Sequence, residues 1–169
     1  MDSSLAVVLS LVITVNPVVI CWSNGPTPVE KKQLRIVVFA FLSGCLFGLG
    51  ALAGGIFDLL EISSPTFRLG AALVIGLSCG KWLVAPKFAP IRGNSNGDSL
   101  HIILHMLSPG PVFAAIAGGG DAGILPLLLA CTILLFTLGV ATLVTVVNIN
   151  IRDAALRLFG GSGIVLAVI

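Results

Sequence analysis

The second half of the chain repeats the first half at an offset of 89 positions (135 minus 46). Residues 46–77 align with residues 135–166, and nine of these 32 aligned pairs are identical, more than an apolar composition gives by chance. The identical pairs are Leu46/Leu135, Phe47/Phe136, Leu49/Leu138, Gly50/Gly139, Ile62/Ile151, Arg68/Arg157, Leu69/Leu158, Ile75/Ile164 and Leu77/Leu166. Each half holds three apolar segments, and an odd number of crossings makes the second copy enter a bilayer from the opposite side. Inverted repeats of this kind are common in small-molecule transporters.

The composition indicates a membrane protein. Hydrophobic residues make up 57% of the chain and charged residues 9%, and the mean hydropathy is +1.13. A soluble domain carries about a quarter charged residues, so lipid is the expected solvent. The net charge of +2 is small and the basic residues are scattered, so nucleic acid is not an expected partner. The first apolar run follows Asp2 without the basic region of a secretory signal, and we interpret it as a mature helix.

Apolar runs and breakers predict an all-α polytopic membrane protein with six transmembrane helices, since about 20 apolar residues span a bilayer. The predicted segments are Leu5–Trp22, Leu34–Leu59, Phe67–Val84, Leu100–Gly118, Ile124–Val147 and Ala154–Ile169. The first three-helix repeat covers residues 1–84 and the second covers residues 100–169. Residues 85–99 form a cytoplasmic connecting loop, and its polar stretch from Arg92 to Ser99 is the boundary between the halves.

Lysine and arginine fall almost entirely on one side of this predicted topology. Eight basic residues lie in alternate connections, and only Arg68 lies on the other side. The eight are Lys31, Lys32, Arg35, Lys81, Lys87, Arg92, Arg152 and Arg157. Cytoplasmic loops carry the positive excess, so both termini are expected outside. Asp58 and Glu61 lie near Arg68, and we interpret this group as an interfacial anchor with an ion pair rather than as a gate.

Proline interrupts two predicted helices at corresponding places. The first helix contains Asn16-Pro17 and the fourth contains Ser108-Pro109-Gly110-Pro111. Proline cannot donate a backbone hydrogen bond, and the groups that it frees need partners in protein or water rather than in lipid. Paired interrupted helices are the best sequence pointer to a binding site at mid-bilayer. The alternative is a pair of kinks that only shape the packing.

The chemistry at these breaks suits a small polar solute. Half-helix N-termini offer amides to an anionic group, and opened carbonyls hold a cation. Asn16 and Ser108 add side-chain hydrogen bonds beside the breaks. His105 lies one turn before Ser108, where an ionisable group is a candidate for proton coupling or solute contact. The candidate binding residues are Asn16, Pro17, His105, Ser108, Pro109, Gly110 and Pro111.

The chain resembles the MarC family of integral membrane proteins, within the LysE transporter superfamily. The resemblance is carried by Val15-Asn16-Pro17-Val18, by Lys31-Lys32-x-x-Arg35, by residues 62–73 (ISSPTFRLGAAL) and by Ser108-Pro109-Gly110-Pro111. It covers nearly the whole chain, although Val18-Val19 replaces the glycine that the family carries after its Asn-Pro. The resemblance implies transport of a neutral amino acid and a location in the cell (inner) membrane of a bacterium or archaeon.

Metal, cofactor and catalytic chemistry are not predicted. His101 and His105 share a helix face, but no His-Glu-x-x-His pattern and no third ligand accompanies them. The four cysteines lack Cys-x-x-Cys spacing and are expected to behave as small hydrophobes. Residues 118–121 (GGGD) are expected to form a glycine turn, without the lysine of a phosphate-binding loop. We therefore do not expect an enzyme or a bound cofactor.

Small residues recur at a spacing typical of close helix packing. The pairs are Gly44/Gly48, Gly50/Gly54 and Gly76/Gly80, each separated by three residues. Such pairs let helix backbones approach closely, first within one chain and second between copies of a homo-oligomer or a larger membrane complex.

Two classes of function remain open at this point. The favoured hypothesis is a secondary transporter or exporter of a small polar solute, with its site between the broken first and fourth helices. The alternative is a nontransporting membrane subunit that docks partner proteins in a larger complex.

Overall fold

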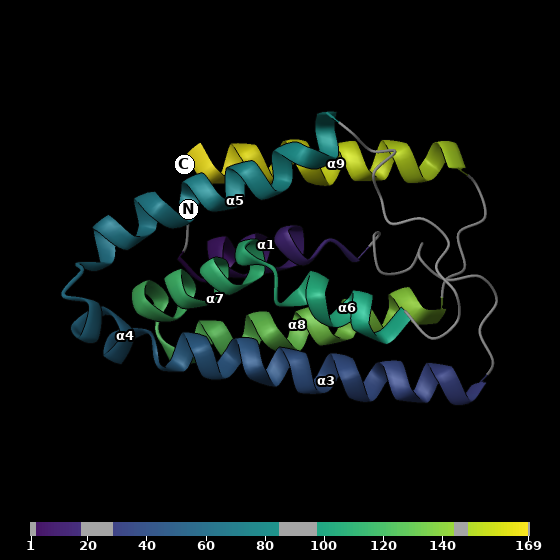
Figure 1. The fold of residues 1–169 in the computed structure, drawn as a ribbon, viewed down its shortest axis with the longest axis horizontal. Helices are drawn as coiled ribbons and strands as arrows, with labels where there is room; N and C mark the ends of the chain where they lie inside the picture. The colour runs from purple at the N-terminus through teal and green to yellow at the C-terminus, as the bar shows by residue number, and fades with distance from the viewer. Residues whose placement is uncertain (1–2, 18–28, 85–97, 144–148, 169) are drawn as a thin grey trace.

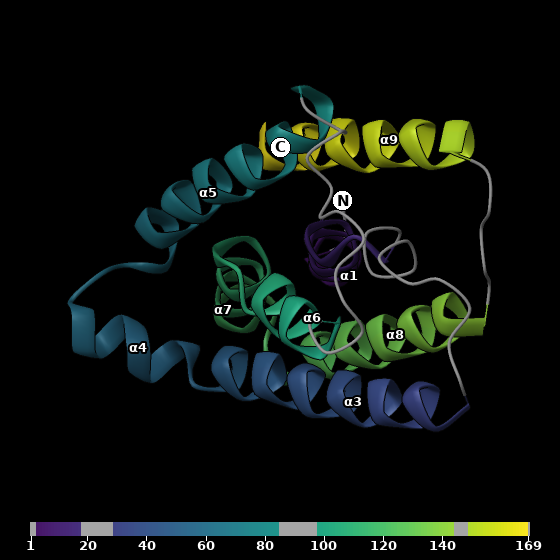
Figure 2. The ribbon, with the colours of Figure 1, turned by 45° about the vertical axis from the view of Figure 1, so that its right-hand side comes forward.

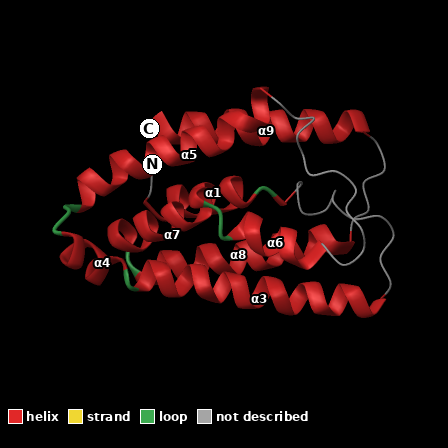
Figure 3. Cartoon of the chain, viewed as in Figure 1, coloured by secondary structure: helices red, strands yellow, loops and turns green. Residues whose placement is uncertain are grey.

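The computed structural model describes residues 3–17, 29–84, 98–143 and 149–168 of the chain. Within these ranges all regular secondary structure is α-helical (Figures 1 and 3), which confirms the predicted all-α class for the described residues. The helices are α1 (Ser3–Val15), α3 (Val29–Ala51), α4 (Ala53–Leu60), α5 (Ser64–Val84), α6 (Asp98–Met106), α7 (Pro109–Ala122), α8 (Ile124–Leu143) and α9 (Ile149–Val168).

Two predicted segments are each divided into two helices. The second becomes α3 and α4 with a turn at Leu52, and the fourth becomes α6 and α7 with a break at Leu107 and Ser108. Helix α6 begins at Asp98, so the last two residues of the predicted loop 85–99 are helical. The ends of the first, fifth and sixth predicted segments and the rest of that loop lie outside the described residues.

Helix α7 is central to the packing, because it contacts α1, α3, α4, α5 and α8. Helices α5 and α9 lie side by side on one flank, and α3 and α8 lie side by side on the other (Figure 2). Helices α1 and α7 pack between the two flanks. The interruptions of α1 and of α6–α7 are therefore held in the interior of the bundle rather than on its outer layers.

A sharp bend separates α4 from α5. Glu61 adopts the left-handed conformation (φ 54°), and the amides of Glu61 and Ile62 donate to the carbonyls of Asp58 and Phe57 at 3.3 and 3.0 Å. These bonds satisfy carbonyls that the end of a helix leaves open. The two helix axes differ in direction by 104°. Helix α5 consequently turns back across α7 towards α9.

The core is a continuous apolar cluster drawn from both halves of the chain. On α3, Phe39, Leu42 and Leu46 recur at helical spacing and are almost fully buried. They pack with Leu134 and Leu138 of α8 in the same cluster. The remaining fully buried members are Leu11 and Val15 of α1, Ile102 and Met106 of α6, Ala115 of α7, and Leu127 and Ala130 of α8.

Three consecutive glycines let α7 approach three different neighbours. A methyl group at Gly118 would lie 2.7 Å from Val7 Cγ1, one at Gly119 would collide with the Gly50 backbone, and one at Gly120 would collide with the Phe57 ring. The expectation of a glycine turn at residues 118–121 was wrong, because these residues belong to α7. The absence of side chains serves helix packing here rather than chain reversal.

The outer faces of the bundle are strongly apolar. Phe41 of α3 is 70% exposed and Phe136 of α8 is 71% exposed. Within the described ranges, one helix window, Leu34–Ala51, is long and apolar enough to cross a membrane, and only 33% of it is buried. The bent pair of α4 and α5 makes a second if it is counted as one span, whereas Leu5–Val15 and Ile124–Val140 are apolar but shorter.

Candidate functional site

Helix α1 ends at a residue with an unusual backbone. Asn16 has φ 47°, in the left-handed region, and its amide still donates to the Val12 carbonyl at 3.1 Å. Asparagine enters this region more readily than other non-glycine residues do. Pro17 has no N–H to donate to the Ile13 carbonyl, so the regular hydrogen-bond ladder of α1 stops here.

The break between α6 and α7 is built by a similar combination. Helix α6 ends at Met106, and the amides of Leu107 and Ser108 donate to the carbonyls of Ile103 and His105 at 2.9 and 3.2 Å. Ser108 has an extended backbone (φ −66°, ψ 159°), and α7 begins at Pro109. Proline is favoured at the first position of a helix, because its missing N–H is not needed there.

The structure places the two breaks side by side. Nε2 of His105 lies 2.8 Å from the carbonyl oxygen of Val15, the last residue of α1. A methyl group on Gly110 would lie 3.7 Å from Cβ of Thr14 and 3.1 Å from Cβ of Ser78 on α5. Because Val7 meets Gly118 and Thr14 meets Gly110, α1 runs antiparallel to α7.

The predicted site residues differ in how deeply they lie. Asn16, Pro17, His105, Gly110 and Pro111 are buried, Ser108 is half-buried, and Pro109 is exposed. Pro109 therefore shapes the start of α7 without facing the interior. The neighbouring Thr14 is also buried, but its hydroxyl donates to the Ser10 carbonyl at 2.7 Å.

The side chain of Asn16 has no hydrogen-bond partner among the described residues. It is 0% exposed, and both Oδ1 and Nδ2 are unpaired. Buried polar atoms are nearly always hydrogen-bonded, and an unpaired amide costs roughly 1–3 kcal/mol. The only other buried side-chain atom without a partner in these ranges is Oγ of Ser43 on α3. A polar solute or water is needed to satisfy this amide.

The start of α7 offers little to an anion. Two of its first three residues, Pro109 and Pro111, have no N–H, and the amide of Val112 is directed to the Ser108 carbonyl at 3.4 Å. Gly110 supplies the one N–H of this first turn. The start of α7 therefore offers an anionic group one amide, fewer than a helix N-terminus without proline would offer.

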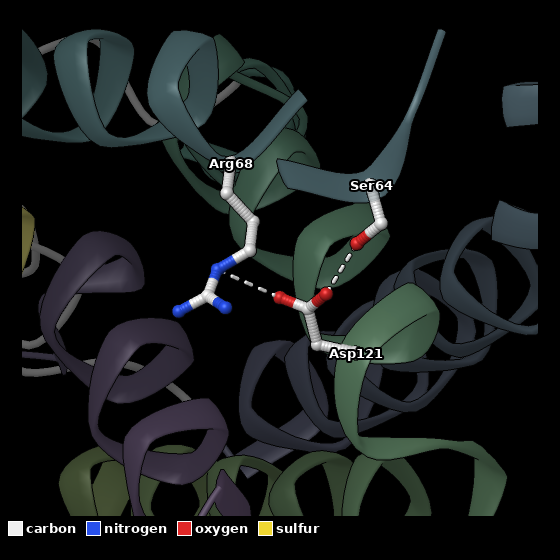
Figure 4. Close-up of polar contacts among 3 residues, drawn as sticks. All are labelled: Ser64, Arg68 and Asp121. Carbon is white, nitrogen blue, oxygen red and sulfur yellow. Dashed lines mark hydrogen bonds and ion pairs between the residues drawn. The ribbon is translucent and has the colours of Figure 1, made fainter. Parts of the chain in front are cut away.

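A second polar cluster lies at the far end of α7 (Figure 4). Nε of Arg68, in the first turns of α5, lies 2.9 Å from Oδ2 of Asp121, and the Ser64 hydroxyl donates to the other carboxylate oxygen. The sequence suggested an anchor formed by Arg68 with Asp58 and Glu61. Asp121 takes that role because α5 folds back across α7.

Sequence reasoning missed three polar residues that the fold brings to the bundle interior. Ser43 was hidden in an apolar run of α3, and Ser78 in a small-residue run of α5. Arg35, at the start of the predicted second segment, was counted with the basic residues of the preceding connection, but α3 begins at Val29 and buries Arg35 to 6% exposure. Ser43 and Arg35 share the helical spacing of the buried face of α3, and that periodicity was the available signal.

No three His, Cys, Asp or Glu side chains gather into a metal-binding group within the described part of the chain. His101 lies in α6, but its side chain is outside the part described. Comparisons with protein-family models, with curated proteins and with solved structures find no match to this chain.

Proposed function

We propose that this chain is an integral membrane protein of six helices, arranged as two inverted three-helix repeats, that carries a small polar solute. The supporting observation is the pairing of two interrupted helices around a buried, unpaired Asn16 amide. Discontinuous helices meeting near the middle of a bundle are how many secondary transporters build a solute site. The resemblance to the MarC family makes neutral amino acids the first solutes to test.

The packing between helices supports the inverted repeat. Exchanging the two halves turns α1 into α6–α7, α3 into α8, and α5 into α9. The contact of α1 with α8 then becomes that of α7 with α3, and the contact of α1 with α9 becomes that of α7 with α5. Contacts of α1 with α7, α3 with α8 and α5 with α9 map onto themselves. These contacts are all present and support the two-fold relation, whereas the contact of α7 with α8 is not matched by a comparable contact of α1 with α3 among the described residues.

The surface supports a location in lipid. Exposed apolar side chains occur on all the long helices, including Leu69, Leu73 and Leu77 on α5 and Leu158 on α9. Monomeric soluble proteins rarely expose apolar patches of this extent. Helix α8 has 20 residues, the length that spans a bilayer, whereas the described part of α1 has 13.

Cysteine labelling from the two sides of the membrane tests the topology. Lys31 lies near the start of α3 and Glu61 at the end of α4, so Lys31→Cys should react with an impermeant thiol reagent only from inside and Glu61→Cys only from outside. The variants are made without the native cysteines. Reaction of both from the same side would contradict the proposed topology.

Flux into proteoliposomes tests the transport function. Purified protein is reconstituted, and uptake of labelled neutral amino acids, small amides and polyols is compared with that of empty liposomes. We expect uptake of at least one solute class, abolished by Asn16→Ala with the protein still folded. Thr132→Ala, an exposed hydroxyl on α8, is the matched control and should leave uptake unchanged. Equal uptake by Asn16→Ala would contradict the proposed site.

A further inference from the structure

Ser43 carries the one buried hydroxyl without a hydrogen-bond partner among the described residues. Inside a helix, a serine or threonine side chain either points to solvent or donates to the carbonyl of the preceding turn. The buried Thr14 donates in this way with a bond of 2.7 Å, and so do the half-buried Thr137 and the exposed Ser162 with bonds of 2.8 Å. Ser43 is 5% exposed, yet its hydroxyl makes no such bond. Its hydrogen-bonding capacity is therefore left for a group outside its own helix.

Ser43 lies at the same level of the bundle as the two breaks. Gly50 of α3 meets Ala115 and Gly119, and farther along Phe57 meets Gly120, so the α3–α4 segment and α7 run in the same direction. Seven residues are about two helical turns, so Ser43 shares a face with Gly50 and lies about 10 Å earlier. The same step back along α7 leads to the break at Ser108.

Asn16 lies at the same level of the bundle, at the end of a helix that runs in the opposite direction. Helix α1 runs antiparallel to α7, and Thr14 packs against Gly110. Asn16 therefore lies opposite the α6–α7 break, as Ser43 does. The three unpaired buried side-chain atoms of the described ranges, Oδ1 and Nδ2 of Asn16 and Oγ of Ser43, thus occur at a single level.

The internal repeat does not explain why the Ser43 hydroxyl is buried and unpaired. Its partner at the 89-position offset is Thr132 of α8 (132 minus 43), which is exposed and donates to the Leu128 carbonyl at 2.8 Å. The two equivalent positions therefore differ in both burial and hydrogen bonding. The unpaired hydroxyl belongs to the first half alone.

We propose that Ser43 and Asn16 together bind a small uncharged group that carries both a hydrogen-bond donor and an acceptor, such as a primary amide or a hydroxyl. The Asn16 amide has donor and acceptor atoms, and the Ser43 hydroxyl is both. The first turn of α7 offers an anion only the Gly110 amide. No buried carboxylate is found among the described residues to balance a cation. This inference rests on the proposed function and adds a binding residue and a ligand class to it.

Accessibility to a water-soluble methanethiosulfonate reagent tests the shared site. Ser43→Cys, Asn16→Cys and the control Thr132→Cys are each made in the full chain, with its four native cysteines replaced. These reagents react with the thiolate, which forms only where water reaches. We expect Ser43→Cys and Asn16→Cys to react many-fold faster than the lipid-facing Thr132→Cys. Faster reaction of Thr132→Cys, or none at Ser43→Cys, would overturn the shared site.

Protection from labelling tests the ligand class. The probes are acetamide, acetate and guanidinium, which are planar and similar in size but neutral, anionic and cationic respectively. Acetamide should slow labelling of Ser43→Cys, while the two ions should not. Protection by acetate would assign the site to anions, with the buried Arg35 as a cation on the same helix, and would overturn the proposed class. Labelling that no probe slows would also overturn it, leaving a site for water alone.

A flux comparison separates this inference from the proposed function. If a solute is carried, Ser43→Ala should raise its KM roughly fivefold, the effect of losing one hydrogen bond. Unchanged KM in a working transporter would refute the role of Ser43 alone. Labelling and acetamide protection without flux of any solute would instead refute transport and leave the binding site standing. Ser43→Thr keeps the hydroxyl and should keep the original KM, which checks that the higher KM of Ser43→Ala reflects the lost hydrogen bond.

Discussion

The imidazole of His105 is bound to the last carbonyl of α1, with Nε2 2.8 Å from the oxygen of Val15, 90 positions away in the chain. A carbonyl oxygen only accepts, so Nε2 must carry the hydrogen. This bond joins the segment before one break to the segment before the other. The position of Asn16, the next residue after Val15, is therefore fixed by a side chain of the opposite repeat.

Removing this imidazole should loosen α1. His105→Ala leaves the buried Val15 carbonyl without this donor, and we expect the free energy of unfolding to fall by about 1–3 kcal/mol. The measurement is thermal or denaturant unfolding of the purified protein in detergent. His105→Gln should recover part of the loss, since its amide also presents an N–H at the end of a side chain. An unchanged unfolding midpoint for His105→Ala would contradict a structural role for the bond.

We expect substitution of Asn16 by glycine to remove transport without lowering thermal stability. Asn16→Gly suits the left-handed backbone and removes the unpaired amide, so we expect equal or higher thermal stability. Flux should be lost, because the amide that contacts the solute is gone. The control is Glu61→Gly, which has φ 54° but an exposed side chain. That variant should keep its flux, and full flux in the Asn16→Gly variant would show that the amide serves no solute.

The ion pair of Arg68 and Asp121 at the end of α7 should contribute little to the free energy of unfolding. The Arg68 side chain is 62% exposed and that of Asp121 is 26% exposed, and such pairs contribute about 0–1 kcal/mol. A double-mutant cycle with Arg68→Gln and Asp121→Asn, measured by unfolding, should give a coupling energy in this range. The coupling should shrink at high salt. A coupling well above this range would indicate a pair that lipid or another subunit shields from water.

The sequence predicted the features that depend on local chain chemistry. Helix α8 begins at Ile124, as the apolar run predicted, and α1 and α6 end two and three residues before their prolines. Proline acts on its own backbone and the preceding turn, so its effect is visible without tertiary information. The helical class and the positions of the breaks could therefore be predicted.

Features that depend on which helices become neighbours could not be predicted. Residues 118–120 were expected to form a turn, but helix packing keeps three glycines in α7, where they contact three other helices. Arg68 pairs with Asp121 of α7, a helix distant from α5 in the sequence. Ser43 is one small polar residue in an apolar run, and only the fold shows that its hydroxyl lacks a partner.

The crossing of α3 and α7 gives the sharpest test of the packing. A methyl group at Gly119 would collide with the Gly50 backbone, which cannot move aside as a flexible side chain can. We expect Gly119→Ala to lower the free energy of unfolding by about 1–3 kcal/mol, the usual cost of overpacking. Gly44→Ala is the matched control, because it adds the same methyl group to α3 with nothing within 4 Å. Alanine is the better helix former, so the control should be neutral or slightly stabilising. Equal unfolding midpoints for the two variants in detergent would contradict the close approach of α3 and α7.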